Sequence, residues 1–248
     1  MNFEERFSLA GRLALVTGAS RGIGRALATG LAEAGADIVA VSRSVDSLKD
    51  VCDDVEALGR RCQIIACDVS DVAAVHRLFE QISEQGLLAD ILVNNAGIED
   101  VAPSTQVDEA LWDRIIDTNL KGAFFVAQNF AKPLMAAGRA GSLINLGSLT
   151  SAVGVPTATP YTSSKSGLLG MTRALSAEWA RDNIRVNAMG PGYFRTELTE
   201  AFYEDEDWQA RMLDKIPMGR FGQLDDLIGM AVFLASNASA YVTGLNGK

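Results

Sequence analysis

Apolar runs and amphipathic stretches alternate along the whole chain, and this alternation predicts its architecture. Six runs are apolar almost throughout, and we expect a buried strand at each of residues 12–18, 36–42, 61–67, 90–95, 142–148 and 183–189. The segments between them carry the spacing of helices that bury one face, and the longest runs from about Asp108 to Ala137. Strands that are apolar on both faces are typical of a parallel sheet covered by helices on both sides. We therefore predict an α/β fold, with one doubly wound parallel sheet in a single domain over residues 1–248.

The composition limits the class of protein. At 248 residues, 48% of them apolar, the chain suits one well-packed domain. Its 31 acidic residues outnumber its 22 basic ones, and the net charge of −9 disfavours binding to nucleic acid. No apolar run reaches the roughly 18 residues of a membrane helix, and the N-terminal MNFEERFSLAG lacks the apolar region of a secretory signal. We expect a cytoplasmic protein that binds neither nucleic acid nor a membrane.

Few residues are available for metal binding or for nucleophilic catalysis. His76 is the single histidine, and it lies in an amphipathic helical stretch where a surface role fits best. Cys52, Cys62 and Cys67 lack the paired spacing of a zinc site, and their odd number disfavours a disulfide framework. We expect no metal site and no nucleophile activated by histidine.

The first predicted strand runs into a glycine-rich turn, TGASRGIG at residues 17–24, which a helix follows. Glycine permits a tight turn and a close approach of the backbone to a pyrophosphate, which the helix N-terminus stabilises. Such a turn can also be a plain connection, but its place at the first strand-to-helix junction favours a dinucleotide site. The loop residues that we expect to bind the cofactor are Gly18, Ser20, Arg21, Gly22, Ile23 and Gly24.

The end of the second predicted strand bears on the choice between NAD and NADP. An NAD site usually places an acidic residue there to bind the ribose hydroxyl, but this chain has Ser42 and Arg43. Arg43, together with Arg21 in the glycine-rich turn, suits a 2′-phosphate because guanidinium groups form charge-assisted bonds with phosphate. We predict that NADP(H) is preferred. NAD(H) is the alternative, because Arg43 can simply be solvated and Asp46 lies close by in sequence.

Six motifs occur in a fixed order: TGASRGIG, NNAG at 94–97, the asparagine of DTNLKG, the serine after INLG, YTSSK at 161–165 and PGYFRT at 191–196. Together they resemble the short-chain dehydrogenase/reductase family, over residues 9 to 244. The resemblance implies a Rossmann-like fold with a seven-stranded sheet, a nicotinamide cofactor and a homotetramer or homodimer. It also implies a catalytic centre of Asn119, Ser148, Tyr161 and Lys165.

The residues of YTSSK suit that role on chemical grounds. Hydride transfer between a nicotinamide and a carbonyl leaves charge on the oxygen, so a proton donor must stand close by. Without a usable histidine, Tyr161 is a sensible donor, but an ordinary tyrosine pKa near 10 is too high. Lys165 lies four residues on, on the same helical face, where its ammonium group would lower the Tyr161 pKa. If Pro160 begins the helix behind a Thr159 cap, the helix dipole acts in the same direction.

Serine and asparagine would support this pair. Ser148 ends the fifth predicted strand, where its hydroxyl can donate to the substrate oxygen; a capping or core role is the alternative. For Asn119 the family implies a kinked helix and a water that leads protons to Lys165, and the alternative is a surface asparagine.

The resemblance implies further contacts with the cofactor at the carboxyl ends of the other strands. Residues after the third strand would flank the adenine, NNAG would line the adenosine side, and PGYFRT would meet the nicotinamide, where Phe194 replaces an expected aliphatic residue. The residues concerned are Asp68, Val69, Asn95, Ala96, Gly97, Pro191, Gly192, Phe194 and Thr196, with Tyr161 and Lys165 at the reacting end.

Residues 195–223 interrupt the alternation and fit a small helical lid over the site. Within them we expect EDED at 204–207 to be a solvated tip, whereas Phe202, Tyr203, Trp208 and Met212 could face the substrate. The arrangement PGYFRTELT…IPMGRFG is most similar to members that act on gluconate-type sugar acids or on 3-oxoacyl thioesters. The acidity of the chain disfavours the acidic acyl carrier of the latter.

The C-terminal residues depart from the family pattern. After YVTG at 241–244, relatives continue into a seventh strand with an end similar to VDGG, whereas here LNGK follows. We expect a frayed C-terminus.

We predict an oxidoreductase that transfers a hydride between NADP(H) and a ketone or secondary alcohol, with a small sugar acid, polyol or 3-oxoacyl compound as substrate. The alternatives are an NAD(H)-dependent sugar-acid dehydrogenase and a catalytically silent NADP-binding sensor or scaffold. Epimerisation is a third reading, but the chain lacks the additional substrate domain expected for it.

Overall fold

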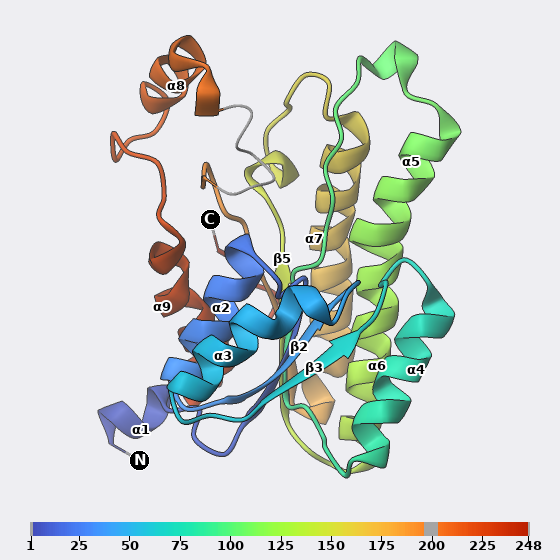
Figure 1. Cartoon of the computed structure of the whole chain (residues 1–248), viewed down its shortest axis with the longest axis vertical. Coiled ribbons are helices and arrows are strands. Elements are labelled where there is room, and N and C mark those ends of the chain that lie inside the picture. The colour runs from blue at the N-terminus through green and yellow to red at the C-terminus, as the bar shows by residue number, and fades with distance from the viewer. Residues whose placement is uncertain (1, 196–202, 248) are drawn as a thin grey trace.

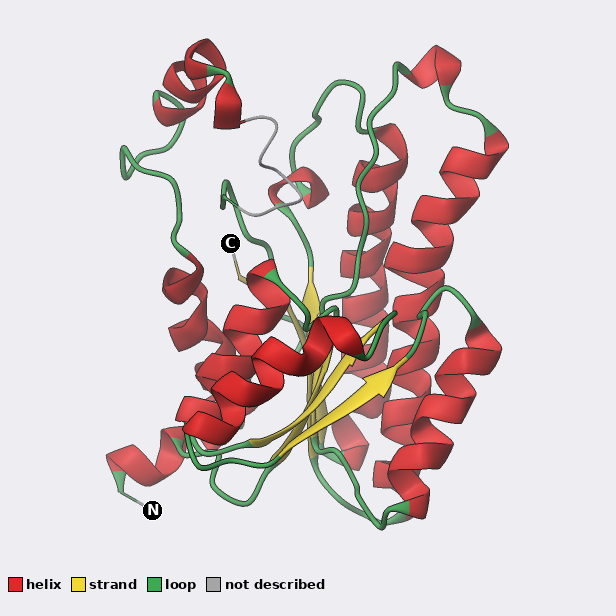
Figure 2. Cartoon of the chain, viewed as in Figure 1, coloured by secondary structure: helices red, strands yellow, loops and turns green. Residues whose placement is uncertain are grey.

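A seven-stranded parallel sheet forms the centre of the computed structural model, which describes residues 2–195 and 203–247 (Figures 1 and 2). Its strand order is β3-β2-β1-β4-β5-β6-β7. Successive strands are added toward one edge from β1 to β3 and toward the other edge from β4 onward, which defines a doubly wound sheet. The strands are β1 (Leu13–Thr17), β2 (Asp37–Ser42), β3 (Cys62–Ala66), β4 (Ile91–Asn94), β5 (Gly141–Leu146), β6 (Ile184–Met189) and β7 (Asn246–Gly247). All six apolar runs predicted as strands are confirmed.

Helices cover both faces of the sheet (Figure 2). One face carries α2 (Gly22–Glu33), α3 (Lys49–Ala57) and α9 (Ile228–Ala235). The other carries α4 (Val72–Glu84), α5 (Glu109–Ile116), α6 (Ala123–Ala136) and α7 (Thr159–Trp179). α1 (Phe3–Phe7) lies near the N-terminus, and α8 (Glu206–Leu213) stands apart beyond the carboxyl ends of the strands (Figure 1). Short helical turns occupy 46–48, 104–106, 149–151, 180–182, 224–227 and 237–239.

The core is divided by the sheet into two apolar layers. Leu27 and Leu31 of α2 pack on one face, and Phe130 and Leu134 of α6 pack on the other; all four are almost fully buried. Burying one such side chain contributes about 1.5–3 kcal/mol to folding. The two layers hold the strands in place, and thereby fix where their carboxyl ends lie.

The long helix predicted from Asp108 to Ala137 is interrupted. A π-helical turn, Asp117–Gly122, separates α5 from α6. Gly122 lies in this turn against Val69, and a Cβ atom added there would collide with the Val69 carbonyl oxygen. Such turns are frequent at functional sites, and this one contains Asn119.

The start of α7 differs from the predicted register. The helix begins at Thr159, so Pro160 is its second residue and Ala158 is the N-cap, with no side-chain capping bond. The prediction of a Thr159 cap is therefore wrong. Tyr161 nevertheless lies in the first turn, as expected.

The C-terminal residues are hydrogen-bonded to the sheet. β7 pairs with β6 in parallel, and the Gly190 amide donates to the Gly247 carbonyl at 2.6 Å. The Leu245 amide donates to the Asn187 side chain at 3.0 Å. β7 has only two residues and falls short of a full seventh strand, but the residues from 244 to 247, where we expected a frayed end, are hydrogen-bonded to the neighbouring strand.

Candidate active site

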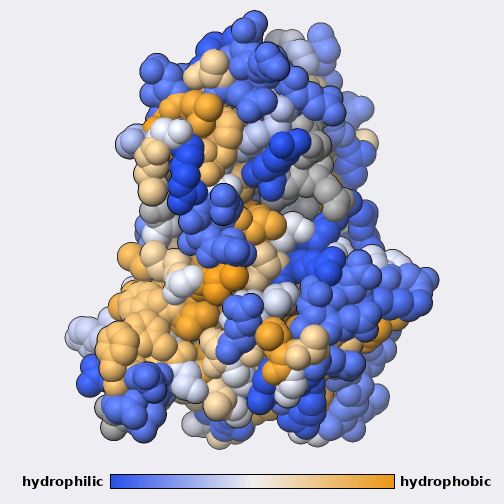
Figure 3. Space-filling view, turned by 60° about the vertical axis from the view of Figure 1, so that its left-hand side comes forward, coloured by the Kyte–Doolittle hydropathy of each residue, from blue (hydrophilic) through white to orange (hydrophobic). Residues whose placement is uncertain are grey.

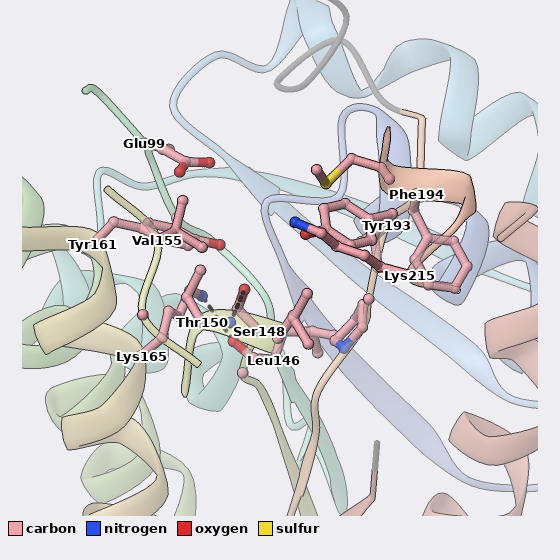
Figure 4. A pocket seen from close by; sticks show the side chains of 18 of the residues that line it. Glu99, Leu146, Ser148, Thr150, Val155, Tyr161, Lys165, Tyr193, Phe194 and Lys215 are labelled. Carbon is pink, nitrogen blue, oxygen red and sulfur yellow. Dashed lines mark hydrogen bonds between the residues drawn. The ribbon is translucent and has the colours of Figure 1, made fainter. Parts of the chain in front are cut away.

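A cavity of about 420 Å³ opens beyond the carboxyl ends of the central strands. Its volume is within the range of small-molecule sites, and a doubly wound sheet places its ligands at this edge. The structure brings together here many of the residues selected from the sequence: Ile23, Asn95, Gly97, Ser148, Tyr161, Lys165, Pro191, Gly192 and Phe194. They come from separate elements, so the fold assembles the site (Figure 4).

Tyr161 and Lys165 line the same cavity from one face of α7. The Lys165 Nζ atom is 5.6 Å from the centre of the Tyr161 ring. It donates a hydrogen bond of 2.7 Å to the Leu146 carbonyl oxygen at the end of β5. Lys165 is only 5% exposed, so this bond and its packing fix the position of the ammonium group.

Burial dominates the ionisation of both groups. It raises the pKa of Tyr161 to about 12, the negative charge of Glu99 acts in the same direction, and a hydrogen bond with Ser148 opposes them. Burial also lowers the pKa of Lys165 to about 8, against the opposing charge of Glu99. The net lowering of the Tyr161 pKa that the sequence predicts is not found, because the loss of hydration and the negative charge of Glu99 raise this pKa. The phenol keeps its proton at neutral pH.

Ser148 has two roles in the geometry. It adopts an extended backbone at the start of the 149–151 turn, and its hydroxyl accepts a hydrogen bond of 3.2 Å from the Thr150 amide. The same side chain lines the cavity beside Tyr161 (Figure 4). The capping role, which the sequence left as the alternative, thus orients a hydroxyl that also faces the site.

Asn119 is buried, and it connects the π-helical turn to the segment after β4. Its Oδ1 atom accepts a hydrogen bond from the Ile98 amide and its Nδ2 atom donates to the Ile98 carbonyl, both at 2.8 Å. A Cβ atom on Gly97 would lie 3.3 Å from Asn119 Oδ1 and 3.5 Å from Lys165 Nζ, so the three residues are neighbours. The alternative of a surface asparagine is excluded. The side chain of Asn119 holds the 97–98 backbone next to Lys165.

The glycine-rich turn has the geometry of a phosphate loop. Gly18 and Gly22 have positive φ angles of 65° and 54°, which favour glycine. At Gly24 an added Cβ atom would collide with the Gly18 carbonyl oxygen. α2 begins at Gly22, and no side chain caps its N-terminus, so its first amide groups suit an anion. The loop residues therefore fit a dinucleotide pyrophosphate.

The NNAG motif at the end of the neighbouring strand β4 forms hydrogen bonds with this loop. The Asn95 side chain donates to the Thr17 and Gly18 carbonyl oxygens at 2.9 and 3.2 Å. In return, the Thr17 hydroxyl accepts from the Asn95 and Ala96 amides, both at 3.0 Å. Thr17 stands at the head of the TGASRGIG motif, but nothing in the sequence singled it out as a functional residue.

The end of β2 lies beside the glycine-rich turn, because the Ala19 amide donates to the Val41 carbonyl at 3.1 Å. The Ser42 hydroxyl donates to the Ser44 carbonyl at 2.8 Å, and the side chain of Arg43 between them is exposed. Asp46, the acidic residue nearest in sequence to the end of β2, is paired with Lys49 at 2.8 Å. The neighbouring Asp68 accepts from both the amide and the hydroxyl of Ser70.

Residues 203–223 form the opposite wall of the cavity. The rings of Tyr193, Tyr203, Trp208 and Phe221 form an aromatic cluster, in which Tyr203 lies 4.8 Å from Phe221 and 5.2 Å from Trp208. Tyr203, Trp208 and Met212 line the cavity as predicted, and the acidic residues 204–207 are exposed. Phe194 contacts Gly222 through a single bridge. Thr196 and Phe202 lie outside the described residues.

Two charged residues of the cavity escaped the sequence reasoning. Glu99 follows NNAG by two positions, and Lys215 follows α8. Only the position of Glu99 just beyond a strand's carboxyl end hinted at the site, and nothing in the sequence marked Lys215. Both side chains reach into the cavity (Figure 4).

His76 and the three cysteines lie outside the cavity. His76 is exposed on α4 and hydrogen-bonds to Asn129 at 3.1 Å. The three cysteines are free. Within residues 2–195 and 203–247, no group of three potential metal ligands occurs, and no helix is both long and apolar enough to cross a membrane.

Comparison with known proteins agrees with this geometry. Residues 18–246 match the family model described as enoyl-(acyl carrier protein) reductase. The 2-dehydro-3-deoxy-D-gluconate 5-dehydrogenase of Dickeya dadantii is 42% identical over 238 residues, which cover 96% of this chain and 93% of that protein. The 3-oxoacyl-(acyl-carrier-protein) reductase of Staphylococcus aureus is 39% identical over 232 residues, or 93% of each protein.

A solved structure confirms the fold as well. The gluconate 5-dehydrogenase of Burkholderia cenocepacia, in complex with NADP and tartrate, superposes with a TM-score of 0.95 at 39% identity. The match covers 99% of this chain and 96% of that one. The resemblances to sugar-acid dehydrogenases and to 3-oxoacyl reductases, and the Rossmann-like architecture, are thereby confirmed. This chain belongs to the short-chain dehydrogenase/reductase family, and it is an oxidoreductase of CH–OH and C=O groups.

Proposed function

We propose that the enzyme uses NADP(H) to interconvert a secondary alcohol and a ketone in a sugar acid or polyol, with Tyr161 as general acid and base. One observation carries the proposal: Ser148, Tyr161 and Lys165 line a single cavity that adjoins the glycine-rich turn. The 42% identical gluconate-type dehydrogenase supports the substrate class.

The bound nicotinamide would supply or accept the hydride. In the direction of reduction, the Tyr161 phenol gives its proton to the substrate oxygen, and Ser148 donates a hydrogen bond to the same oxygen. Because burial raises the Tyr161 pKa to about 12, the phenol carries its proton at neutral pH, although the higher pKa makes it a weaker acid than an ordinary tyrosine. In the direction of oxidation Tyr161 must first lose its proton, and the charged form of Lys165 stabilises the resulting phenolate.

Asn119 acts on this centre from a distance. It fixes the backbone at Gly97 and Ile98 through two hydrogen bonds of 2.8 Å, and this backbone adjoins Lys165. We expect it to keep open the route by which a water exchanges protons with Lys165. Its role is to position other groups.

The activity is tested by following the absorbance of reduced nicotinamide over a panel of sugar acids, polyols and 3-oxoacyl esters. We expect turnover of at least one sugar acid or polyol. The 39% identical Staphylococcus aureus reductase makes 3-oxoacyl thioesters the second class to test. Turnover of 3-oxoacyl esters alone would overturn the substrate assignment. NADPH binding with no turnover over the whole panel would support the silent sensor or scaffold instead.

The cofactor preference rests on the charge at the end of β2. Arg43 is exposed there, Arg21 precedes α2, and Asp46 is already paired with Lys49. Arg43→Gln should raise the KM for NADPH about tenfold and leave that for NADH unchanged, since charge-assisted hydrogen bonds contribute about 1.5–3 kcal/mol. Arg181→Gln, in the turn before β6, is the matched control. Tighter binding of NADH than of NADPH by the unaltered enzyme would contradict the assignment.

The remaining cofactor contacts follow from the same arrangement. The adenine would lie near residues 68–69. This segment lies beside the end of β2, because the Cys67 amide donates a hydrogen bond of 2.7 Å to the Ser42 carbonyl. The nicotinamide would lie near residues 191–194, where Gly192 leaves open space. We expect residues 203–223 to form part of a lid over the cavity, and the contacts of the aromatic cluster hold them in place.

We also propose that the chain forms a homodimer or homotetramer. Apolar residues gather on one face of the molecule (Figure 3). Among the exposed large hydrophobic side chains are Met230 of α9 and Tyr241 near the C-terminus. Such a face is typical of a protein interface. Sedimentation analysis should show an oligomer that Met230→Lys weakens, whereas Leu58→Lys, at the C-cap of α3, should not. A monomeric unaltered protein would contradict the proposal.

A further inference from the structure

We propose that Glu99 and Lys215 set the polarity of the substrate. Glu99 selects an uncharged, hydroxyl-bearing segment around the reacting carbon, and Lys215 receives an anionic group at the far end. The inference deepens the proposed function and rests on it, because the substrate is taken to react at Tyr161.

Glu99 lies at the reacting end of the cavity. It follows β4, it is half-buried, and its carboxylate points into the space above Tyr161 (Figure 4). Its charge acts on both Tyr161 and Lys165, so it lies close to the centre where the proton moves. Among the described residues it forms no ion pair and no side-chain hydrogen bond. A carboxylate that is withdrawn from water without a donor favours a ligand that supplies one.

Lys215 lies on the opposite wall. It comes shortly after α8, and its backbone amide donates to the Met212 carbonyl at 3.0 Å. Its ammonium group extends across the cavity toward the side of Glu99 and Tyr161 (Figure 4). In the part of the chain that the structure describes, this group has no acidic partner. A carboxylate or phosphate on the substrate can therefore pair with it.

The two charges discriminate between related compounds. A 2-hydroxy or 2-oxo acid carries its carboxylate next to the reacting carbon, and this places it against Glu99, where like charges repel. A sugar acid that reacts far from its carboxylate presents hydroxyl donors to Glu99 and its anionic end to Lys215. A 3-oxoacyl thioester offers no hydroxyl group beside the reacting carbon, so it leaves Glu99 without a donor.

The experiment measures both turnover and binding. Gluconate, glucitol and lactate are compared as substrates with NADP⁺, and their dissociation constants for the complex of enzyme and NADP⁺ are measured by calorimetry. The variants are Glu99→Gln, which removes the charge and keeps the shape, and Lys215→Met. Glu84→Gln and Lys132→Met remove the same charges from exposed positions on α4 and α6 and serve as controls.

We expect Lys215→Met to weaken gluconate binding about tenfold and to leave glucitol within about twofold, as loss of one ion pair predicts. Glu99→Gln should weaken gluconate and glucitol alike and tighten lactate, so that the ratio of lactate to glucitol affinity rises at least about tenfold. The control variants should change neither the ratio of gluconate to glucitol affinity nor the ratio of lactate to glucitol affinity.

The inference is overturned if Lys215→Met affects gluconate and glucitol equally, if Glu99→Gln leaves the ratio of lactate to glucitol affinity unchanged, or if none of these ligands binds. Failure of the proposed function is a separate outcome. In that case the variants change the ligand affinities as expected, but the unaltered enzyme oxidises none of the ligands.

Discussion

The two walls of the cavity are built in different ways. On the sheet side, Ser148, Lys165 and Asn119 are each fixed by hydrogen bonds to the backbone of a strand end or to the segment that follows one. On the lid side, the ring contacts of Tyr203 and Trp208 hold α8, whose acidic tip is exposed. Directional bonds fix the groups that we propose to move a proton, whereas ring packing, which tolerates small shifts, holds the wall that we propose to contact the rest of the substrate.

Removal of the Tyr161 hydroxyl should have the largest effect. Tyr161→Phe should lower kcat by about 10²–10⁴-fold, because it deletes the proton donor from the rigid wall. Binding of NADPH, measured by fluorescence titration, should stay within about threefold, so that the loss can be assigned to catalysis. Turnover equal to that of the unaltered enzyme would show that another group supplies the proton.

Lys165 should leave a signature in the pH dependence of stability. Its pKa is lowered from 10.5 to about 8, so between these values the unfolded chain holds a proton that the folded chain has released. The free energy of unfolding should therefore rise with pH over this window, by an amount on the order of 3 kcal/mol relative to Lys165→Met. Urea unfolding at several pH values measures this difference.

The matched control is Lys132→Met, which alters an exposed lysine of α6. It should show no such difference between pH 8 and 10. If Lys165→Met and the unaltered enzyme keep a constant difference in stability, the ammonium group is not destabilised by burial.

Asn119 joins the two segments that flank the reaction centre, so its loss should weaken the rigid wall. Asn119→Ala leaves the half-buried Ile98 amide without its partner, which costs about 1–3 kcal/mol of stability. We expect kcat to fall at least about tenfold while the KM for NADPH changes little. Asn129→Ala, on the same face as His76, serves as the control in both assays. Equal effects of the two variants would show that Asn119 has no special place in the site.

Trp208 tests the lid wall. Trp208→Ala removes ring contacts at 5.2 and 5.9 Å, each of which contributes about 0.5–1.5 kcal/mol. The KM for substrate should rise about threefold to tenfold with kcat nearly unchanged, as expected where only uniform binding is lost. Trp112→Ala, at an exposed position of α5, is the comparison. A large loss of kcat would mean that the lid wall also positions the reacting groups.

Most of the sheet, the glycine-rich turn and the pairing of Tyr161 with Lys165 could be predicted, because they depend on local sequence patterns. Strand positions followed from continuous apolar runs, and the glycine-rich turn followed from residues that alone adopt its backbone angles. Tyr161 and Lys165 could be paired because helical spacing places them on one face. The resemblance implied a kinked helix at Asn119, but the hydrophobic pattern alone did not reveal the π-helical turn, since it depends on the fit of Gly122 against Val69, which is distant in sequence.

The electrostatics of the site could not be predicted for a related reason. The sign of the Tyr161 shift depends on how completely the fold removes water, and spacing along a helix says nothing of that. Lys215 was overlooked because its contribution arises only when α8 folds over the opposite side of the cavity. Glu99 was overlooked because a carboxylate beside a proton donor opposes the acidification that we had expected.

The reciprocal bonds between Thr17 and Asn95 have a mechanical consequence. These hydrogen bonds join the turn that would bind the pyrophosphate to the segment that continues into Gly97, beside Lys165. If the dinucleotide binds at this turn, as proposed, the same bonds place its pyrophosphate about one strand's width from the segment beside Lys165, and we expect the coenzyme to bind before the substrate.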